Sequence, residues 1–379
     1  MKKTVAFFSL LVSIFIVTTQ ALAYDLALER QKALNWVSLQ RVRNGVTYDW
    51  VAVNDTATYG YTYDNALAII AYTAVGKLDD ARALLNFLSR YQLSDGSFYD
   101  SMFQATGTVR NATRSSGNQA WALYAVAFYT HQTGDSVYLP MADRIASWLI
   151  ARQDPADGGI TGGLNSNGSE RLWTSTEHNL DIYFALKLYG VVTNNAYYLD
   201  KANRCKDWLL NVGWNSAENR FNTGENDPSK FLDPQSIGVI FMNDIGDLTK
   251  RNALLKYADR NFGTRKSFGS GSVRQSYSGY EYGSKDGSLW WEGTEQMAIA
   301  YGRSGSGSKE LNLVNHILAS DDPTRLGSDN DGDGGLQYSM VSGTNQLGTV
   351  EQPSPGLWLI FAINDYLKDQ PTLFYPTVY

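Results

Sequence analysis

A repeat of about 60 residues is the feature that most constrains this chain of 379 residues. Six apolar segments recur along the chain, and each begins with a short, mostly polar pair: Asp64-Asn65, Asn118-Gln119, His178-Asn179, Pro234-Gln235, Glu295-Gln296 and Pro355-Gly356. Successive pairs are 54, 60, 56, 61 and 60 residues apart. Self-similarity at such a period is typical of a fold built from repeated supersecondary units. Six units with one apolar helix each predict a ring in which the helix N-termini surround a polar mouth.

Six amphipathic segments alternate with the apolar ones and predict a second set of helices. They span residues 25–42, 78–91, 138–152, 197–211, 248–261 and 309–319. Ala81, Leu84, Leu85 and Leu88 form one apolar stripe opposite charged residues, as in a helix with one face on the core and the other in water. The apolar segments have no such polar face and should be buried on all sides. The predicted fold class is therefore all-α, an (α/α)6 toroid of six helical hairpins with short β-hairpins in its loops.

The connections between the segments indicate which face of the ring carries function. Asp95-Gly96, Asp157-Gly158 and Asp333-Gly334 predict three similar tight turns that lead towards inner helices. Long loops are expected before the inner helices, as at 161–176 and 263–289, and short turns after them, as at 75–77 and 189–190. Binding residues concentrate on loops that a rigid scaffold carries. The face with the inner-helix N-termini should therefore hold the functional site.

Residues 1–23 are predicted to be a signal peptide, which leaves 24–379 as a single domain. Lys2 and Lys3 precede an apolar stretch that ends at the small-residue site Ala21-Leu22-Ala23. An uncleaved anchor helix is the alternative. No other segment is long and apolar enough to span a membrane, so we expect an exported protein, periplasmic or extracellular, without stable membrane insertion after cleavage.

Composition narrows the classes of partner. The single cysteine, Cys205, excludes an intrachain disulfide, and its helical context without a basic neighbour predicts a buried filler rather than a nucleophile. The net charge of −6 without a Lys/Arg cluster argues against nucleic acid or an anionic membrane as partner. Ten Trp and 24 Tyr residues favour stacking surfaces for sugars, although aromatic residues also fill cores. The expected partner is a poly- or oligosaccharide, and the sequence does not indicate an oligomeric state.

Two segments extend the pattern to a known superfamily. They are Ser175-Thr-Glu177-His178-Asn179-Leu-Asp181 and Trp290-Trp291-Glu292-Gly-Thr-Glu295-Gln296. Together with the repeat, which covers essentially all of 24–379, they resemble the six-hairpin glycosidases and exported bacterial proteins of that kind. The resemblance implies an (α/α)6 toroid and points to no single hydrolase family. It does not imply one reaction, because the superfamily also contains polysaccharide lyases, sugar epimerases and, more distantly, terpene cyclases.

Seven carboxylates lie at or just before the apolar helices: Asp64, Glu177, Asp181, Asp233, Glu292, Glu295 and Glu351. Helix capping and the helix dipole account for part of this enrichment, and Asp64 and Asp233 are compatible with a capping role alone. A ring nevertheless brings these groups together, and glycoside hydrolysis requires a proton donor and a carboxylate that acts as nucleophile or base. We expect Glu177 and Glu292 to be catalytic, and Asp64 is the third candidate, as base or as substrate clamp.

A further set of residues is expected to contact the substrate: Tyr63, Asn65, Asn118, Trp173, His178, Asn179, Asp181, Trp290, Trp291, Glu295 and Glu351. The tryptophans can stack on a sugar, while the amides of these residues and of Gln235 and Gln296 offer donors and acceptors. The alternative for the amides is that they bond neighbouring loops and hold the ring together. His178 is either a substrate contact or a structural hydrogen-bonding group.

One metal motif is present. Asp329, Asp331 and Asp333, followed by Gly334, match the D-x-D-x-D-G start of a calcium loop. Met340 stands where an EF-hand requires Glu, so the motif predicts either a structural calcium site of another kind or an acidic β-turn. No cofactor is expected to be required for activity, since no zinc cluster, P-loop, dinucleotide fingerprint or G-x-S-x-G motif occurs.

Four functions fit these observations. The leading hypothesis is an exported glycoside hydrolase that cleaves a polysaccharide or exopolysaccharide with a carboxylate pair. A polysaccharide lyase would use tyrosine and His178, with Arg110, Arg114 and Arg171 available for a uronate. An epimerase commonly relies on paired histidines, of which one is well placed here. A non-catalytic glycan-binding or assembly protein is the alternative from another class.

Overall fold

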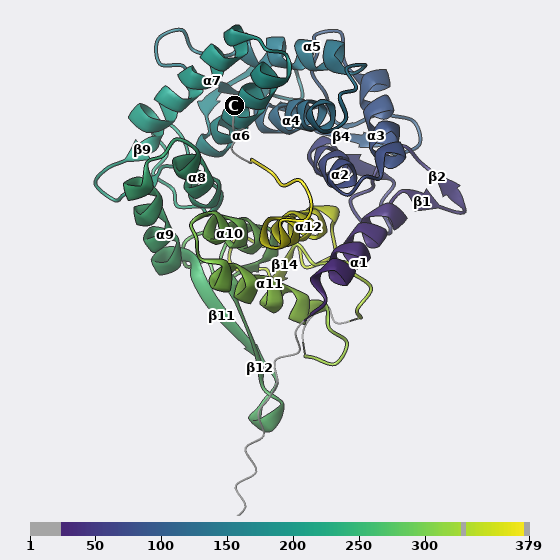
Figure 1. Cartoon of the computed structure of the whole chain (residues 1–379), viewed down its shortest axis with the longest axis vertical. Helices are drawn as coiled ribbons and strands as arrows, with labels where there is room; N and C mark the ends of the chain where they lie inside the picture. Colours follow the sequence, from purple (N-terminus) through teal and green to yellow (C-terminus); the bar gives the residue numbers. More distant parts are fainter. Residues whose placement is uncertain (1–23, 327–330, 375–379) are drawn as a thin grey trace, which may run out of the picture.

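Two concentric rings of helices form the molecule (Figure 1). The computed structural model describes residues 24–326 and 331–374. The inner ring consists of α2 (Thr62–Ala74), α4 (Ser116–Thr133), α6 (Thr176–Val192), α8 (Asp233–Asp244), α10 (Trp291–Arg303) and α12 (Pro353–Leu367). The outer ring consists of α1 (Leu26–Leu39), α3 (Leu78–Tyr91), α5 (Leu139–Ile150), α7 (Ala196–Trp208), α9 (Leu248–Phe262) and α11 (Gly307–Asp321). Each inner helix contacts the inner helix on either side, and α12 contacts α2, so the inner ring is closed.

The burial of each ring follows from its sequence pattern. In α2 every residue except Tyr63 is buried, as the uniformly apolar segment predicts. In α3 the buried residues are confined to one stripe that includes Ala81, Leu84, Leu85 and Leu88. The prediction of an all-α toroid with buried inner and amphipathic outer helices is therefore confirmed.

Short antiparallel strands decorate the N-terminal ends of the inner helices. The sheets pair β1 (Val42–Arg43) with β2 (Val46–Thr47), β3 (Tyr59–Tyr61) with β4 (Ser101–Phe103) and β5 (Val109–Asn111), β6 (Arg114–Ser115) with β7 (Thr161–Leu164) and β8 (Glu170–Thr174), and β9 (Trp214–Asn215) with β10 (Arg220–Phe221). A fifth sheet runs in the order β11 (Gly263–Phe268), β12 (Gln275–Tyr280), β13 (Leu289–Trp290), β14 (Ser339–Val341). The β11–β12 hairpin projects beyond the ring (Figure 1). Strands β3, β6, β8 and β13 lead directly into α2, α4, α6 and α10, so they fix where those helices begin.

Four fully buried amides repeat one contact around the inner ring. In each case the side-chain oxygen accepts a hydrogen bond from the backbone N–H of one apolar residue that precedes the helix. The side-chain NH2 group donates to the carbonyl oxygen of the same residue. The pairs are Asn65 with Val51 (2.7 and 3.0 Å), Gln119 with Phe98 (2.8 and 2.9 Å), Asn179 with Ile160 (2.8 and 3.0 Å) and Gln235 with Phe221 (3.0 and 3.0 Å). The expectation that Asn65 and Asn179 contact substrate is therefore wrong, because both amides are used to tie loops to the ring.

The three Asp-Gly turns share one geometry, as their sequences predict. Gly96, Gly158 and Gly334 have φ values of +94°, +89° and +92°. A Cβ on any of them would lie 2.5 Å from the backbone of a residue in a neighbouring outer helix. Only glycine fits such a turn without strain. These turns therefore hold each loop close against the outer ring.

The turn expected at residues 189–190 lies a few residues later. Helix α6 continues through Gly190 to Val192, and Asn194 adopts a left-handed φ of +48° in the turn that follows. A Cβ on Gly190 would lie 2.7 Å from the Leu199 side chain. This glycine lets α7 pack closely on α6 and does not interrupt the helix.

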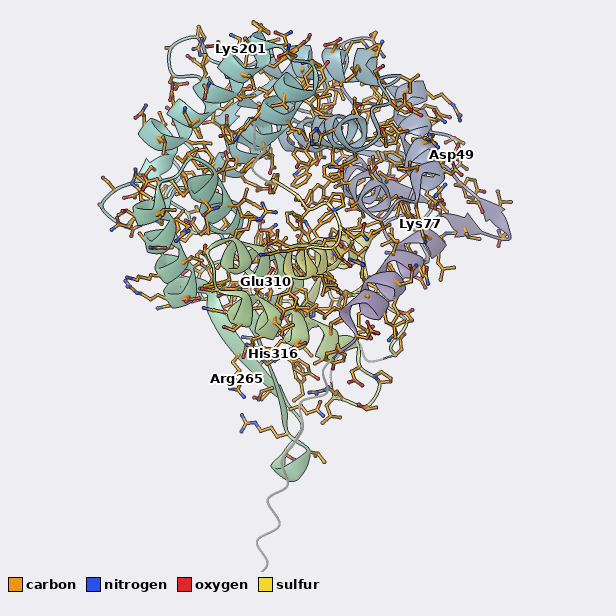
Figure 2. The ribbon with its side chains drawn as sticks, in the orientation of Figure 1. Asp49, Lys77, Lys201, Arg265, Glu310 and His316 are labelled. Atoms are coloured by element: carbon orange, nitrogen blue, oxygen red, sulfur yellow. The ribbon has the colours of Figure 1, made fainter. Side chains whose placement is uncertain are left out.

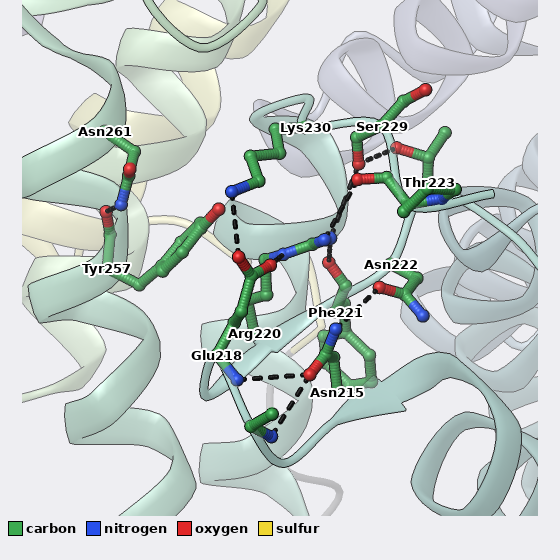
Figure 3. Close-up of polar contacts among 12 residues, drawn as sticks. Asn215, Glu218, Arg220, Phe221, Asn222, Thr223, Ser229, Lys230, Tyr257 and Asn261 are labelled. Atoms are coloured by element: carbon green, nitrogen blue, oxygen red, sulfur yellow. Dashed lines mark hydrogen bonds and ion pairs between the residues drawn. The ribbon is translucent and has the colours of Figure 1, made fainter.

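A buried arginine anchors the loop that precedes α8 (Figure 3). The Arg220 guanidinium donates to the carbonyl oxygens of Phe221 and Pro228, at 2.9 Å each, and pairs with Glu218 at 2.5 Å. Lys230 reaches the other Glu218 oxygen at 2.9 Å. This network holds β9–β10 beside the start of α8, where Asp233 enters the site described below.

Several remaining predictions have structural outcomes. Cys205 is buried, and burial raises its thiol pKa to about 12, which confirms the reading as an inert filler. Lys201 lies on outer helix α7, at the periphery of the ring (Figure 2). Within residues 24–326 and 331–374, no helix has the length and apolar character needed to cross a bilayer. The predicted signal peptide, 1–23, lies outside the described residues.

Candidate active site

A cavity of about 310 Å³ opens where the N-termini of the inner helices meet. All six inner helices line it, together with strand and loop residues that precede them: Tyr61, Tyr63, Asp64, Gly117, Asn118, Trp121, Glu177, His178, Asp181, Asp233, Ile237, Tyr282, Trp290, Glu292, Gln296, Tyr338, Gln352, Ser354 and Trp358. The second residue of a helix faces the cavity in five of the six cases, as Tyr63, Gly117, Glu177, Glu292 and Ser354. The polar mouth that the repeat predicts is therefore present.

Five of the seven predicted carboxylates meet in this cavity. Asp64, Glu177, Asp181, Asp233 and Glu292 all line it, although they come from four different helices. Glu295 does not, because it lies one turn further into α10 and is fully buried, and neither of its oxygens has a hydrogen-bond partner among the described residues. Glu351 also lies outside the cavity and accepts a hydrogen bond from the Trp36 indole at 3.1 Å.

Glu292 is the carboxylate that the protein holds most firmly. Its Oε1 accepts from the Tyr63 hydroxyl at 2.5 Å and its Oε2 from the Ser354 hydroxyl at 3.0 Å. The Trp358 indole in turn donates to the Tyr63 oxygen at 2.8 Å. Burial raises the pKa of Glu292 to about 7, while these donors act in the opposite direction by favouring the ionised form. The network therefore orients Glu292 as an acceptor at the cavity wall.

Glu177 has a different environment. It is half-buried, and within the described residues no hydrogen bond reaches its carboxyl group. Burial, followed by the charge of Glu292, raises its pKa to about 7. A carboxyl group with a pKa near neutrality is protonated in a substantial fraction of molecules at pH 7 and can donate that proton to a leaving oxygen.

Asp64, Asp181 and Asp233 complete the acidic lining. Burial, and after it the Glu292 charge, raises the pKa of Asp64 to about 8. Burial and nearby carboxylates also raise the pKa values of Asp181 and Asp233 well above the usual range. Asp233 is the first residue of α8 and accepts a hydrogen bond from Gln296 at 3.2 Å, so it faces the cavity and is not the N-cap of the helix, which is Leu232.

His178 and Asn118 line the cavity as predicted, and both also have structural partners. The His178 Nδ1 lies 3.0 Å from the Ser116 hydroxyl, and burial lowers the pKa of the imidazole to about 4. The imidazole is therefore neutral at physiological pH. Asn118 donates to Asp100 at 2.8 Å. The other histidines lie elsewhere, with His316 on outer helix α11 (Figure 2).

The three tryptophans that were predicted to stack on a sugar lie in three different environments. Trp290 lines the cavity, whereas Trp291 is buried in the core and does not, so the expectation that Trp291 contacts substrate is wrong. The side-chain direction alternates at the junction of β13 and α10, which separates these neighbours. Trp173 is 50% exposed on β8, with its ring centroid 5.5 Å from that of His178. It therefore lies beside the cavity mouth and not within it.

The floor of the cavity is aromatic and was not apparent from sequence. Trp121 and Trp358 line it from α4 and α12, with ring centroids 5.7 Å apart. Behind Trp121 lies Phe374, whose segment crosses the ring after α12 (Figure 1). Its ring centroid is 5.6 Å from Trp121 and 4.3 Å from Phe184 on α6. The segment that follows α12 thus supports the floor from the opposite face of the ring.

Five other residues that line the cavity were not predicted from the sequence. Tyr61, Gln352 and Ser354 lie just before an inner helix or in its first turn, which was the available signal, whereas Tyr282 and Tyr338 lie nine and fifteen residues before α10 and α12. Their side-chain direction depends on strand pairing between repeats, which the sequence does not reveal.

A second cavity, of about 890 Å³, lies at the opposite ends of the inner helices. Asp365 is the carboxylate among its lining residues, and Arg303 is paired with it at 2.8 Å. This cavity therefore lacks two free carboxyl groups facing one space, although it is the larger of the two.

The arginines considered for a uronate lie outside the candidate active site. Arg110 stacks over Tyr59 with its guanidinium carbon 4.0 Å from the ring centroid, and Arg114 pairs with Asp95 at 2.8 Å. Arg171 donates to Asn165 at 3.1 Å and to Ser115 at 3.3 Å. None of the three lines the cavity.

The predicted metal loop is partly described. Asp329 lies outside the described residues, while Asp331 and Asp333 meet Asp321 from the end of α11, each with an oxygen within 4.8 Å of the others. Asp321 already accepts from the N–H groups of Gly332 and Gly334, at 2.9 and 3.1 Å. Oxygens at such positions suit calcium, yet Asp333 also makes the same side-chain-to-backbone turn as Asp95 and Asp157. Both readings of the motif fit this geometry.

Comparison with known proteins places the fold. No family model matches the sequence, and no curated protein matches it. A solved structure described as "Glycosidase Wild Type" superposes with a TM-score of 0.66 over 91% of this chain and 98% of its own, at 11% identity. A D-mannose isomerase gives a TM-score of 0.67 (90% and 97% coverage, 11% identity). A GH76 alpha-mannanase from Bacteroides thetaiotaomicron gives 0.60 (91% and 97%, 13% identity). This chain therefore has the six-hairpin glycosidase-like fold, the (α/α)6 toroid.

Proposed function

We propose that this protein is a glycoside hydrolase that cleaves a poly- or oligosaccharide. The observation that carries the proposal is the pair Glu177 and Glu292, which face one sugar-sized cavity in different environments. Within the described residues no hydrogen bond reaches the Glu177 carboxyl group, and burial favours its protonated form, whereas Glu292 accepts from two hydroxyl groups. Pairs whose environments differ in this way divide into proton donor and carboxylate.

In this mechanism Glu177 protonates the oxygen of the leaving sugar. Glu292, held by Tyr63 and Ser354, acts on the anomeric side as nucleophile or as the base that activates water. Asp64 lies in the same cavity and serves as a substrate clamp, or as base if water approaches from its side. Trp121, Trp290 and Trp358 supply apolar surface for the sugar ring and exclude water from the acids.

Two alternative reactions and one non-catalytic function have weaker support. A lyase acting on uronates needs positive groups near the substrate carboxylate, and no Lys or Arg is found among the described lining residues. The structural similarity to a D-mannose isomerase suggests isomerisation as a second alternative. Such reactions commonly rely on paired histidines, but among the described lining residues His178 is the one histidine, and its pKa is low. A non-catalytic glycan-binding protein would not need carboxyl groups with raised pKa values, which are costly to bury.

Export and a polysaccharide or exopolysaccharide substrate belong to the same proposal. The support for export is the charged, apolar and small-residue order of residues 1–23. The exposed Trp173 beside the mouth offers a stacking surface beyond the sugar held in the cavity. A chain longer than one sugar would use both surfaces.

The test is reducing-end release from a panel of polysaccharides, with absorbance near 235 nm followed in parallel to detect the unsaturated product of a lyase. New reducing ends without absorbance support hydrolysis. A gain in absorbance would replace the proposal with a lyase, and binding without either product would replace it with a glycan-binding protein.

A further inference from the structure

The cavity contains more carboxyl groups than a hydrolase needs. Hydrolysis uses two, and Asp64, Asp181 and Asp233 remain after Glu177 and Glu292 are assigned. All three are at least nine-tenths buried. Asp64 lines the cavity, and within the described residues no hydrogen bond or ion pair reaches it. A buried carboxyl group without a partner is destabilising, so a bound ligand is the natural source of its partner.

No positively charged side chain of the described residues lines the cavity beside these carboxyl groups. Among the described lining residues there is neither Lys nor Arg, and the nearest candidate, Arg171, donates to Asn165 and Ser115 instead. A uronate, a sulfated sugar or a sugar phosphate in the cavity would meet like charges in a poorly hydrated space. The lining therefore favours neutral or positively charged sugars.

A metal ion does not explain the surplus acids. Three carboxylates that share one ion must bring their oxygens close together around it. In the parts of the chain that the structure describes, the one such group is Asp321, Asp331 and Asp333, and none of these residues lines the cavity. The cavity carboxylates instead surround a space of about 310 Å³, which fits one sugar ring.

We propose that the cavity binds a hexosamine residue with a free, protonated amino group, and that Asp64 accepts a hydrogen bond from its ammonium. This inference rests on the proposed glycoside hydrolase and names the sugar class at its central subsite. An ammonium offers three N–H donors and one positive charge. It would supply donors to Asp64, and its positive charge would favour the ionised form of Asp64 beside Glu292, whereas an N-acetyl group would bring neither the charge nor three donors.

The experiment measures binding without turnover. Methyl glycosides of glucosamine, N-acetylglucosamine, glucose and glucuronic acid, as both anomers, are titrated into the full mature chain by calorimetry or ligand-observed NMR at pH 6. Glucosamine should bind at least tenfold more tightly than the other three. In Asp64→Asn the preference for glucosamine over glucose, both measured on the same variant, should be lost. Asp79→Asn, which removes an exposed charge from α3, is the control and should keep this preference.

Two results would overturn the inference. One is glucose or N-acetylglucosamine binding as tightly as glucosamine, and the other is an unchanged glucosamine preference in folded Asp64→Asn. Circular dichroism establishes that the variant is folded. Failure of the proposed reaction is seen separately: selective glucosamine binding without cleavage of any glycan contradicts the hydrolase alone, and cleavage of neutral glycans without amine preference contradicts the inference alone.

Discussion

Replacing Asp64 by Asn should stabilise the protein, and increasingly so as the pH rises. Burial and the Glu292 charge raise the pKa of Asp64 from 3.8 to about 8. A carboxyl group whose pKa is raised on folding contributes fully to stability below its unfolded pKa. That contribution is lost as the pH rises towards the folded pKa, because the unfolded chain releases the proton first.

The size of the effect follows from the shift. A difference of about four pKa units at ~1.36 kcal/mol per unit gives a ceiling of ~5 kcal/mol. Relaxation and water entry at the cavity reduce this, so we expect Asp64→Asn to gain ~2–4 kcal/mol at pH 8 and almost nothing near pH 4. Functional groups often lower the stability of the folded protein, so replacing such a group, here Asp64, increases the free energy of unfolding.

Urea unfolding of the two proteins at pH 4.5, 6, 7 and 8 measures this difference directly. Asp259→Asn is the matched control with the opposite sign, because Lys309, Tyr280 and Tyr301 all bind Asp259 and lower its pKa. That variant should lose stability at neutral pH. A free-energy difference for Asp64→Asn that is independent of pH, or a destabilisation at pH 8, would refute the account of Asp64 as an uncompensated buried acid.

Four further changes test other parts of the structure. Tyr63→Phe removes the 2.5 Å hydrogen bond to Glu292, which lowers the pKa of that carboxyl group. In this variant kcat should fall ~10–100-fold and the acidic limb of the pH–rate profile should move to higher pH. An unchanged profile would contradict this role of Tyr63. Asn179→Ala leaves the Ile160 backbone unsatisfied, so thermal unfolding should show a loss of ~2–4 kcal/mol; a loss below 0.5 kcal/mol would argue against the loop tie. Phe374→Ala should cost ~3 kcal/mol and increase acrylamide quenching of tryptophan fluorescence, whereas Phe374→Leu should largely restore both. Calcium, compared with EGTA, should raise Tm by several degrees if Asp321, Asp331 and Asp333 hold a structural ion, and an equal Tm would favour the acidic turn.

The fold was predictable because burial pattern and period act on every repeat. Uniformly apolar segments at a regular spacing have few solutions other than inner helices of a ring. The position of Glu177 and Glu292 at the cavity was predictable because each lies where a loop meets an inner helix, beside tryptophan residues, and both are second residues of those helices.

The errors arise where tertiary contacts decide the outcome. Glu295 was aligned with Asp64 by its polar neighbour, but α10 begins at Trp291, so Gly293 occupies the third position that Asp64 holds in α2. Asn65 and Asn179 resemble ligands for sugar until their loop partners are seen. Trp121 and Trp358 lie in segments where a side chain facing the core and one facing a cavity have the same sequence pattern. Phe374 reaches the floor because its segment folds back across the ring.

The most direct test of the central claim separates binding from turnover in two variants. On the polysaccharide that gives the highest wild-type rate, Kd and kcat are measured for Glu177→Gln and Glu292→Gln. If these residues are the acid and the carboxylate, each variant should lose about 10²–10⁴-fold in kcat. Its Kd should stay within about threefold of the wild type, which corresponds to a change in binding free energy of less than ~0.7 kcal/mol. A kcat within tenfold of the wild type for either folded variant would contradict the assignment, and losses confined to Kd would make the cavity a binding site without chemistry at these groups.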